Sequence, residues 1–475
     1  MVSIRDFVSF LGNAHNGQIT LIALEVTLLL GVIWLIFKKN KSNHRSVLTE
    51  DEEEELINAY RPESLTGDVP ATHPALRPRV VTGKIGVYVE LEGVRCLNFS
   101  THDYLGFVGD DRIEAETTKC IGTYGVGACG PRGFYGTTLE HLELERSLAE
   151  FTGLADALVY AYGFATAASA IPAYAKKDDI IFVDEKRNFA IQRGLDASKS
   201  TVKFFKHNDT KDLEAILDKV KEEDLKDPRR ARRSRRYLIA EGIYINTGEI
   251  CPLPGLVRLC KKHKVRIVID ESISFGVLGK TGRGVSEYYG VPREDVDLII
   301  GSLEYVLGSV GGFCVGSRFL VDHQQASGLG YCFSASLPPL LATAALEGLR
   351  TIQREPGRLT RLRESCHSLH SRLQLSAVIN NHFDVSGDPD SPVKLLTLPD
   401  HTPDPETTLE RILEFCMSKR VAVTHAAFLP VDSAMVTPSL RITVSVLHSQ
   451  DHIAYLVLVL EDACRHVFFH CYTAQ

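Results

Sequence analysis

The chain has 475 residues, with 44% hydrophobic and 24% charged side chains and a formal net charge of -7. This composition excludes bulk disorder, and the negative balance gives no overall attraction to nucleic acid. Eleven cysteines are scattered singly from Cys96 to Cys471 without a CxxC pair, which predicts reduced thiols and indicates neither a zinc site nor a disulfide framework.

The first predicted element is a helix over the apolar stretch Ile19–Phe37, long enough to cross a bilayer core of about 30 Å. Glu25 would cost about 3 kcal/mol at mid-membrane, so we expect it near an interface or against a partner. A cleaved signal peptide is disfavoured because charge follows the apolar run, while a buried soluble helix stays open as an alternative. Residues 1–48 are thus predicted to hold a single-pass transmembrane helix. The positive-inside rule places the body in the cytosol, because basic residues follow directly: Lys38, Lys39, Lys41 and Arg45.

Residues 49–95 are predicted to form a connector and an amino-terminal arm. Thr49 and Glu52 have capping-box spacing and open a short acidic helix. The stretch from Pro70 to Pro78 predicts an extended linker, and a pair of short strands follows on either side of a turn at Gly93.

Helical periodicity alternates with short apolar strands through residues 96–340. This alternation predicts a large α/β domain whose sheet is mostly parallel, with helices on both faces. Residues 341–475 contain long helices, a Pro- and Asp-rich stretch and one further strand, which predict a smaller carboxyl-terminal domain. The predicted strands of the large domain are Ala157–Tyr160, Ile180–Val183, Lys203–Phe205, Tyr237–Ala240, Val265–Ile269 and Leu298–Ile300.

A basic run from Arg229 to Arg236 precedes one of these strands. It is open to interpretation as a patch for nucleic acid or anionic lipid, and lipid headgroups are the better functional choice for a tethered body. The acidic stretch Glu222–Asp224 lies just upstream, however, and favours a solvated loop that partly neutralises itself.

Two loops at strand ends carry chemistry, because a doubly wound sheet binds ligands at the carboxyl ends of its strands. Tyr162–Thr166 combines a glycine with the free amides of a helix start, which favour phosphate binding. The alternative is that the glycine only marks the boundary between loop and helix. Val268–Ser272 places the acidic pair Asp270-Glu271 at the end of a buried strand. Such a carboxylate suits a protonated ring nitrogen, as pyridoxal enzymes require, and a helix cap is the alternative.

Several motifs, taken together and in order, resemble one enzyme family. Asp270–Gly276 resembles the Asp-Glu-Ala-His-Ser-x-Gly motif of the α-oxoamine synthases, and further matches are Asn98–Gly106, Tyr124–Gly127 with Arg132, and His207–Asp209. The resemblance runs from about residue 74 to the end. It implies a fold-type I aminotransferase-like α/β structure and an enzyme that condenses an acyl-CoA with an amino acid, releasing carbon dioxide.

The position of the family's Schiff-base lysine is occupied by Tyr305. The family motif Gly-Thr-(Leu/Phe)-(Gly/Ser)-Lys-Ala-Leu-Gly aligns with Gly301–Gly308, and the following Gly311-Gly312 fixes the register. A phenol cannot form an imine with pyridoxal phosphate, so this chain is predicted to have no catalytic residue of its own.

Other cofactor positions of the family are also replaced. Asn188 stands where a histidine stacks on the cofactor ring, Ile273 where the motif has its histidine, and Ala335 where a threonine commonly reaches the neighbouring subunit's phosphate. Asp270 survives, and without the rest of the site we expect it to be structural. Arg441 stands in the strand that provides the family's substrate-carboxylate ligand, but the arginine-rich pattern around it is lost.

The family includes heterodimeric enzymes in which one subunit carries the lysine and the other does not. The resemblance implies that a lysine-bearing homologue binds pyridoxal phosphate covalently, that both chains contribute loops to the site, and that small regulatory subunits join the complex at the endoplasmic reticulum membrane. A self-sufficient enzyme with non-covalent cofactor and a pure scaffold are the alternatives. The residues expected at the partner's site or the interface are Tyr124, Cys129, Arg132, Phe134, Tyr135, Tyr331, Ser334 and Ser336.

Two of these residues allow more than one interpretation. Cys129 has no histidine or lysine close in sequence to activate it, so packing against the partner is favoured over a reactive thiol. Arg132 suits either a carboxylate, phosphate or CoA group, or an ion pair at the interface. No metal site is expected.

Overall fold

The computed structural model describes residues 16–42, 48–62, 65, 76, 78–425 and 437–469. The chain divides into two compact units, Met1–Pro70 and Ala71–Gln475. Most of the linker predicted at Pro70–Pro78 lies outside the described residues.

Among its described residues, 16–42, 48–62 and 65, the first unit has two helices, α2 (Asn16–Ser42) and α3 (Glu50–Ala59). The predicted capping box of α3 is confirmed: Glu52 N donates to Thr49 Oγ1 at 3.3 Å, and Thr49 N donates to Glu52 Oε2 at 2.9 Å. Helix α2 exposes large apolar side chains along its middle, including Leu24, Leu28 and Trp34. Across the described ranges, no helix combines the length and the hydropathy needed to span a membrane, so the span predicted at Ile19–Phe37 is unconfirmed.

The second unit is built on a seven-stranded sheet with the order β3-β9-β8-β7-β6-β4-β5. All of its strands run parallel except β9, which is antiparallel to both β3 and β8. The six predicted strands and their mostly parallel arrangement are therefore confirmed. The strands are β3 (Asp156–Tyr160), β4 (Ile180–Asp184), β5 (Thr201–Phe205), β6 (Arg236–Glu241), β7 (Arg266–Asp270), β8 (Leu298–Ser302) and β9 (Gly312–Gly316).

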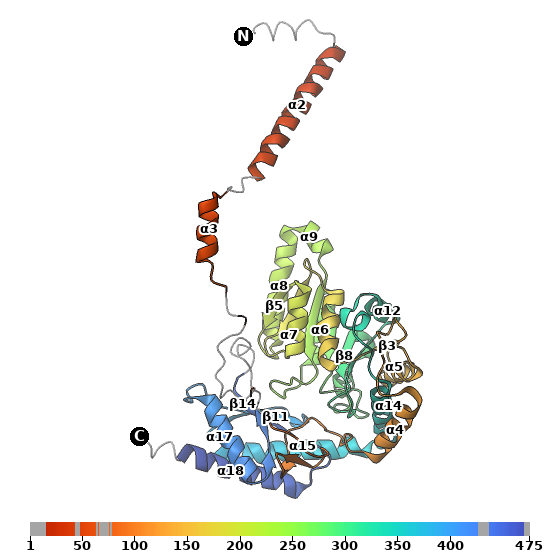
Figure 1. The fold of residues 1–475 in the computed structure, drawn as a ribbon, viewed down its shortest axis with the longest axis vertical. Coiled ribbons are helices and arrows are strands. Elements are labelled where there is room, and N and C mark those ends of the chain that lie inside the picture. Colours follow the sequence, from red (N-terminus) through yellow and green to blue (C-terminus); the bar gives the residue numbers. More distant parts are fainter. Residues whose placement is uncertain are drawn as a thin grey trace. The chain divides into compact units, whose positions relative to one another are not determined.

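Helices cover both faces of this sheet, because its buried strands are apolar on both sides. On β4, Phe182 packs into one core and the neighbouring Ile181 and Val183 into another. Figure 1 shows α6, α7 and α8 grouped around the β5 side of the sheet. The helices of this part are α4 (Asp111–Tyr124), α5 (Leu139–Thr152), α6 (Gly163–Tyr174), α7 (Phe189–Ser198), α8 (Thr210–Lys226), α9 (Pro228–Arg233), α10 (Leu253–His263), α11 (Val285–Tyr289), α12 (Arg318–Ser327), α13 (Leu329–Cys332) and α14 (Pro339–Arg354).

The carboxyl-terminal part contains a second, four-stranded antiparallel sheet with the order β10-β11-β14-β13. Helices α15, α17 and α18 lie beside it (Figure 1). A three-stranded sheet, β1-β2-β12, joins the amino-terminal arm to this part of the chain. The elements are β1 (Tyr88–Leu91), β2 (Val94–Asn98), α15 (Gly357–Leu375), α16 (Ala377–Asn380), β10 (Asp384–Ser386), β11 (Val393–Thr397), α17 (Pro405–Ser418), β12 (Val421–Ala422), β13 (Thr424–His425), β14 (Ser439–Thr443) and α18 (Gln450–Phe469).

Candidate functional site

Polar side chains gather where the central strands end, as the sequence predicted for a doubly wound sheet. Asp184 ends β4, Glu241 ends β6 and Asp270 ends β7, and all three carboxyl groups are buried. Glu241 and Asp270 are neighbours in the parallel ladder. Burial raises the pKa of both, and in Glu241 the nearby charge of Asp270 raises it further.

The carboxylate of Asp270 already has hydrogen-bond donors within this chain. Asn188 Nδ2 donates to Asp270 Oδ2 at 2.9 Å, and Ser272 N donates to Asp270 Oδ1 at 2.9 Å. Asn188 also caps α7, because its Oδ1 accepts from Ile191 N at 2.9 Å. The residue that replaces the ring-stacking histidine therefore uses its amide to hold the aspartate.

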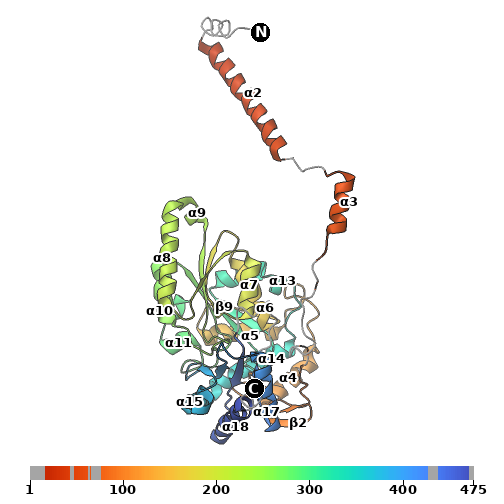
Figure 2. The same ribbon diagram turned by 90° about the vertical axis from the view of Figure 1, so that its left-hand side faces the viewer.

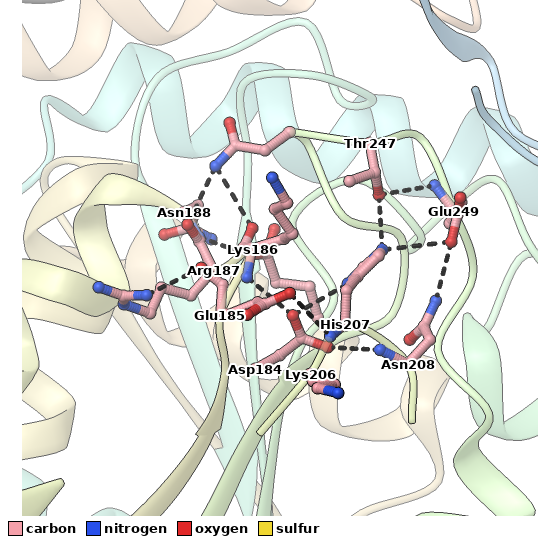
Figure 3. Close-up of polar contacts among 12 residues, drawn as sticks. Asp184, Glu185, Lys186, Arg187, Asn188, Lys206, His207, Asn208, Thr247 and Glu249 are labelled. Atoms are coloured by element: carbon pink, nitrogen blue, oxygen red, sulfur yellow. Dashed lines mark hydrogen bonds and ion pairs between the residues drawn. The ribbon is translucent and has the colours of Figure 1, made fainter. Parts of the chain in front are cut away.

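The loop that carries Asn188 is fixed by a network around Asp184 (Figure 3). His207 Nδ1 lies 2.9 Å from Asp184 Oδ1, and Asn208 N donates to Asp184 Oδ2 at 2.9 Å. On its other side, His207 Nε2 lies 3.2 Å from Glu249 Oε2. The His207-Asn208 motif thus joins the ends of two strands to the loop of Glu249, whose part in this network the sequence did not reveal.

His207 is held as a cation between two carboxylates. Burial alone would lower the pKa of His207, but its hydrogen bonds to Asp184 and Glu249 outweigh burial and raise the pKa to about 9. The hydrogen bond from His207 in turn lowers the pKa of Glu249. At neutral pH the network is an ion triad that stabilises the loop.

Tyr305 follows β8 at the edge where the other strand ends meet. Its ring centre lies 4.7 Å from that of His102, and its carbonyl accepts from Tyr104 N at 3.3 Å. Burial raises the pKa of the Tyr305 phenol to about 12, so it is neutral at physiological pH. This position has neither an amine nor an ionised nucleophile.

The amino terminus of α6, predicted as a phosphate site, is occupied by a carboxyl group of the chain itself. Gly163 N donates to Glu304 Oε1 at 3.4 Å, and a Cβ added at Gly163 would lie 3.1 Å from both that oxygen and Ser302 Oγ. Burial raises the pKa of Glu304. The side chain before Tyr305 therefore lies where the free helix amide could otherwise receive a phosphate.

These contacts decide whether the residues present suit pyridoxal phosphate. Tyr305 offers no amine, Asn188 holds Asp270, and Glu304 lies at the α6 amide. Ile273 is buried in the main apolar core and Ala335 is exposed, and neither side chain has a polar atom that could bond to a cofactor. The site in this chain does not fit the cofactor.

Arg132 is engaged inside the chain. Its two terminal nitrogens donate to Glu145 Oε1 and Oε2 at 2.7 and 2.9 Å, and its side chain is 4% exposed. Arg132 Nε donates to Thr137 Oγ1 at 3.0 Å, and the guanidinium lies 5.5 Å from the centre of the Tyr331 ring. The sequence left open an ion pair at the interface or a bound anion, but the pair in the structure is a different one, formed with Glu145 of the same chain.

The two loops expected to reach a partner lie side by side. Ser336 Oγ donates to Gly136 O at 2.5 Å, and Ser336 N donates to Gly130 O at 2.9 Å. Ser336 is buried and Ser334 is half-buried, so the first joins the loops and the second lies near their surface. Several side chains of these loops are exposed: Val126, Cys129, Phe134, Tyr135 and Phe333.

A hollow of about 620 Å³ lies next to these loops, between α4, α5 and α14. Tyr124, Leu139 and Leu142 line it together with charged side chains such as Glu143 and Arg350. Leu139 and Leu142 are 72% and 47% exposed, so they add apolar area to this hollow. The loops and the hollow form one partly apolar surface.

Arg441 lies on β14 near Tyr104 and Tyr305. Burial lowers the pKa of its guanidinium, and within residues 78–425 and 437–469 its Nε has no hydrogen-bond partner. No acidic side chain of the described chain pairs with it.

The fold and the strand-end site define a protein of the aminotransferase class I and II family, whose pattern matches residues 94–460. The "Long chain base biosynthesis protein 1b" of Oryza sativa subsp. japonica is 37% identical over 438 residues, which cover 91% of this chain and 89% of the relative. "Serine palmitoyltransferase 1" of Dictyostelium discoideum is 34% identical, with 90% and 91% covered. The chain belongs to this family of long chain base biosynthesis protein 1 and serine palmitoyltransferase 1.

A solved enzyme structure has the same fold. A serine palmitoyltransferase from S. paucimobilis with a bound PLP-myriocin aldimine has a TM-score of 0.74 at 24% sequence identity, with 82% of this chain and 93% of that chain covered. This likeness confirms the aminotransferase-like α/β fold predicted from the sequence.

Proposed function

We propose that this chain is the lysine-less subunit of a heterodimeric serine palmitoyltransferase. The complex condenses L-serine with palmitoyl-CoA to 3-oxosphinganine, CoA and carbon dioxide, the first step of sphingolipid synthesis. The observation that carries the proposal is Tyr305 within a retained fold whose cofactor positions are held by Asn188 and Glu304. A chain of this kind supports an active site that belongs to its partner.

The partner is a lysine-bearing homologue of the long-chain-base subunit 2 type, and it binds pyridoxal phosphate covalently. The cofactor supplies the electron sink for decarboxylation and condensation. This chain contributes the surface formed by the loops 124–137 and 331–336 and by the hollow beside α4. The exposed Phe134, Tyr135 and Phe333 on that surface support the assignment, since exposed aromatic side chains are common at protein interfaces.

We further propose that the first unit anchors the complex in the endoplasmic reticulum membrane, with the second unit in the cytosol. The exposed Leu24, Leu28 and Trp34 of α2 support a contact with the bilayer. Glu25 is then suited to an interface or to a small regulatory membrane subunit that binds α2.

Co-expression tests the heterodimer. The chain is produced alone, with its lysine-bearing partner, and with a partner whose Schiff-base lysine is replaced by alanine, and condensation of serine with palmitoyl-CoA is measured. We expect condensation activity only when this chain is produced with the partner that keeps its lysine. Activity of this chain alone would contradict the assignment of Tyr305.

A second comparison separates a subunit that completes the active site from a pure scaffold. Ser334→Ala lies on the proposed cross-subunit loop, and Ser418→Ala is its matched control on an exposed position of α17. We expect Ser334→Ala to change KM or kcat of the complex while the amount of complex stays constant, and the control to change neither. Unchanged kinetics in both would favour the scaffold.

A further inference from the structure

The basic run identified in the sequence forms a short helix rather than the solvated loop we expected. Helix α9 continues from α8 after a break at Asp227, whose carboxylate accepts from Arg230 N at 3.1 Å and caps the new helix. Pro228 at the first helical position favours this start. Figures 1 and 2 both show α9 at the end of α8, at the margin of the second unit.

Only two arginines of the basic run form the ion pairs with acidic residues that we expected. Arg236 pairs with Asp224 and Arg235 pairs with Asp179. Glu222 and Glu223 form no ion pair with the run within the described chain. Four exposed arginines likewise have no acidic partner among the described residues, and we call them the α9 patch: Arg229, Arg230, Arg232 and Arg233.

The charge around the α9 patch is opposite to that of the protein. From Lys219 to Arg236 the sequence has nine basic and four acidic residues, a net charge of +5, whereas the whole chain has -7. An isolated positive region on a negative protein attracts a localised anionic surface. Guanidinium groups pair with phosphate through two parallel hydrogen bonds, so phosphate is the chemistry that this patch recognises.

A lipid surface fits this patch better than nucleic acid. The remainder of the chain is acidic and would repel an extended polyanion, whereas a lipid headgroup layer needs to touch only the patch. Leu225, next to the patch at the end of α8, is 76% exposed and can enter the headgroup region. Helix α2 of the same chain also exposes apolar side chains, which gives the chain a second segment suited to contact lipid.

We propose that the α9 patch binds the phosphates of anionic phospholipid headgroups, such as phosphatidylinositol, at a membrane surface. Single weak membrane contacts are reversible, and two contacts on one chain hold it more firmly than either does alone. The α9 patch would thereby fix which face of the second unit points to the bilayer. The proposal requires neither the catalytic partner nor enzymatic activity.

The full-length chain is bound to vesicles of phosphatidylcholine alone or with added phosphatidylinositol, and hydrogen–deuterium exchange is followed in peptides from 219 to 236. We expect slower exchange in this segment only with phosphatidylinositol, and loss of the effect at high salt. In the variant R229Q/R230Q/R232Q/R233Q, the affinity gained from phosphatidylinositol should fall at least tenfold, since each basic residue contributes about fivefold.

The matched control removes four exposed basic residues elsewhere, K280Q/R361Q/R372Q/K419Q, and should keep the gain. Equal exchange on both vesicles, or an equal gain in the α9 variant and the wild type, would overturn the proposal. So would protection of the segment by a short RNA but not by phosphatidylinositol. None of these outcomes bears on the condensation assay, so the proposed function stands or falls separately.

Discussion

At the scale of single residues, the bidentate ion pair of Arg132 and Glu145 holds the loop 124–137, which is proposed to face a partner, to helix α5. Both side chains are nearly inaccessible, and Glu145 Oε1 also accepts from Val159 N at 2.9 Å. Breaking a buried pair leaves a desolvated charge without a partner. Arg132→Ala should therefore lower the free energy of unfolding by about 3 to 5 kcal/mol.

Denaturant unfolding of the full chain measures this effect, and Arg146→Ala is the matched control. Arg146 pairs with Glu143 on the same helix, but its side chain is 63% exposed. The control should cost less than about 1 kcal/mol. Equal decreases in the free energy of unfolding of the two variants would show that the buried pair stabilises the fold no more than the exposed pair does.

The ion triad around His207 predicts a pH dependence. The folded pKa of His207 is about 9 and its ordinary value is 6.5. Because the folded value is the higher one, the stabilisation is complete below pH 6.5, declines as the pH rises, and is lost above about pH 9. The unfolding free energy of the wild type should thus exceed that of His207→Gln below neutral pH and approach it near pH 9.

Chemical denaturation of both proteins at several pH values tests this expectation. His367→Gln is a suitable control, because His367 also contacts a carboxylate, Asp390, but its side chain is 53% exposed. A difference between wild type and His207→Gln that stays constant from pH 6 to pH 10 would contradict the charged triad.

At the scale of elements, the alternation of apolar runs was enough to predict six strands of the central sheet. Strand β9 was not predicted because Gly312–Gly316 is short and begins and ends with glycine. Its first glycine was interpreted as part of the lysine motif rather than as the start of a strand. Because β9 is antiparallel to β8, it needs no crossover helix after β8, and the βα alternation that predicted the other strands is absent here. Strands β10 and β11 were missed for a similar reason, since turn residues such as Gly387 and Asp388 separate them.

The loops 124–137 and 331–336, which are proposed to bind the partner, carry exposed phenylalanines. Phe134 and Phe333 are 68% and 77% exposed and touch little of their own chain. The double variant F134S/F333S should leave the unfolding free energy of the isolated chain within about 0.5 kcal/mol of wild type. Its Kd for the lysine-bearing partner should rise tenfold or more, because exposed aromatic side chains are frequent interface anchors.

Phe319→Ser is the control for this prediction, since Phe319 is equally exposed at 79% but lies on α12. Affinity is measured by titrating one purified subunit with the other. An equal loss of affinity in the control would indicate a general effect of exposed phenylalanine rather than an interface at these loops.

At the scale of the whole molecule, the fold has been kept while its cofactor positions have been filled. The assignment of Tyr305 to the family's lysine position stays a prediction from the sequence, made because flanking glycines fix the register of the lysine motif. The contact between Glu304 and Gly163 and that between Asn188 and Asp270 were not predictable, because each joins residues far apart in sequence. Sequence motifs thus predict which cofactor groups this chain lacks, and the structure shows the contacts of the residues at those positions.

This distinction predicts the result of restoring the lysine. Tyr305→Lys alone should not bind pyridoxal phosphate, because Glu304 would still lie at the α6 amide and Asn188 would still hold Asp270. The triple variant N188H/E304G/Y305K removes both obstacles and should gain binding. Borohydride reduction followed by mass measurement of the full chain detects the covalent product in each variant. If Tyr305→Lys alone were labelled as fully as the triple variant, the missing amine would be the sole barrier, and the contacts of Asn188 and Glu304 would be incidental to the loss of cofactor.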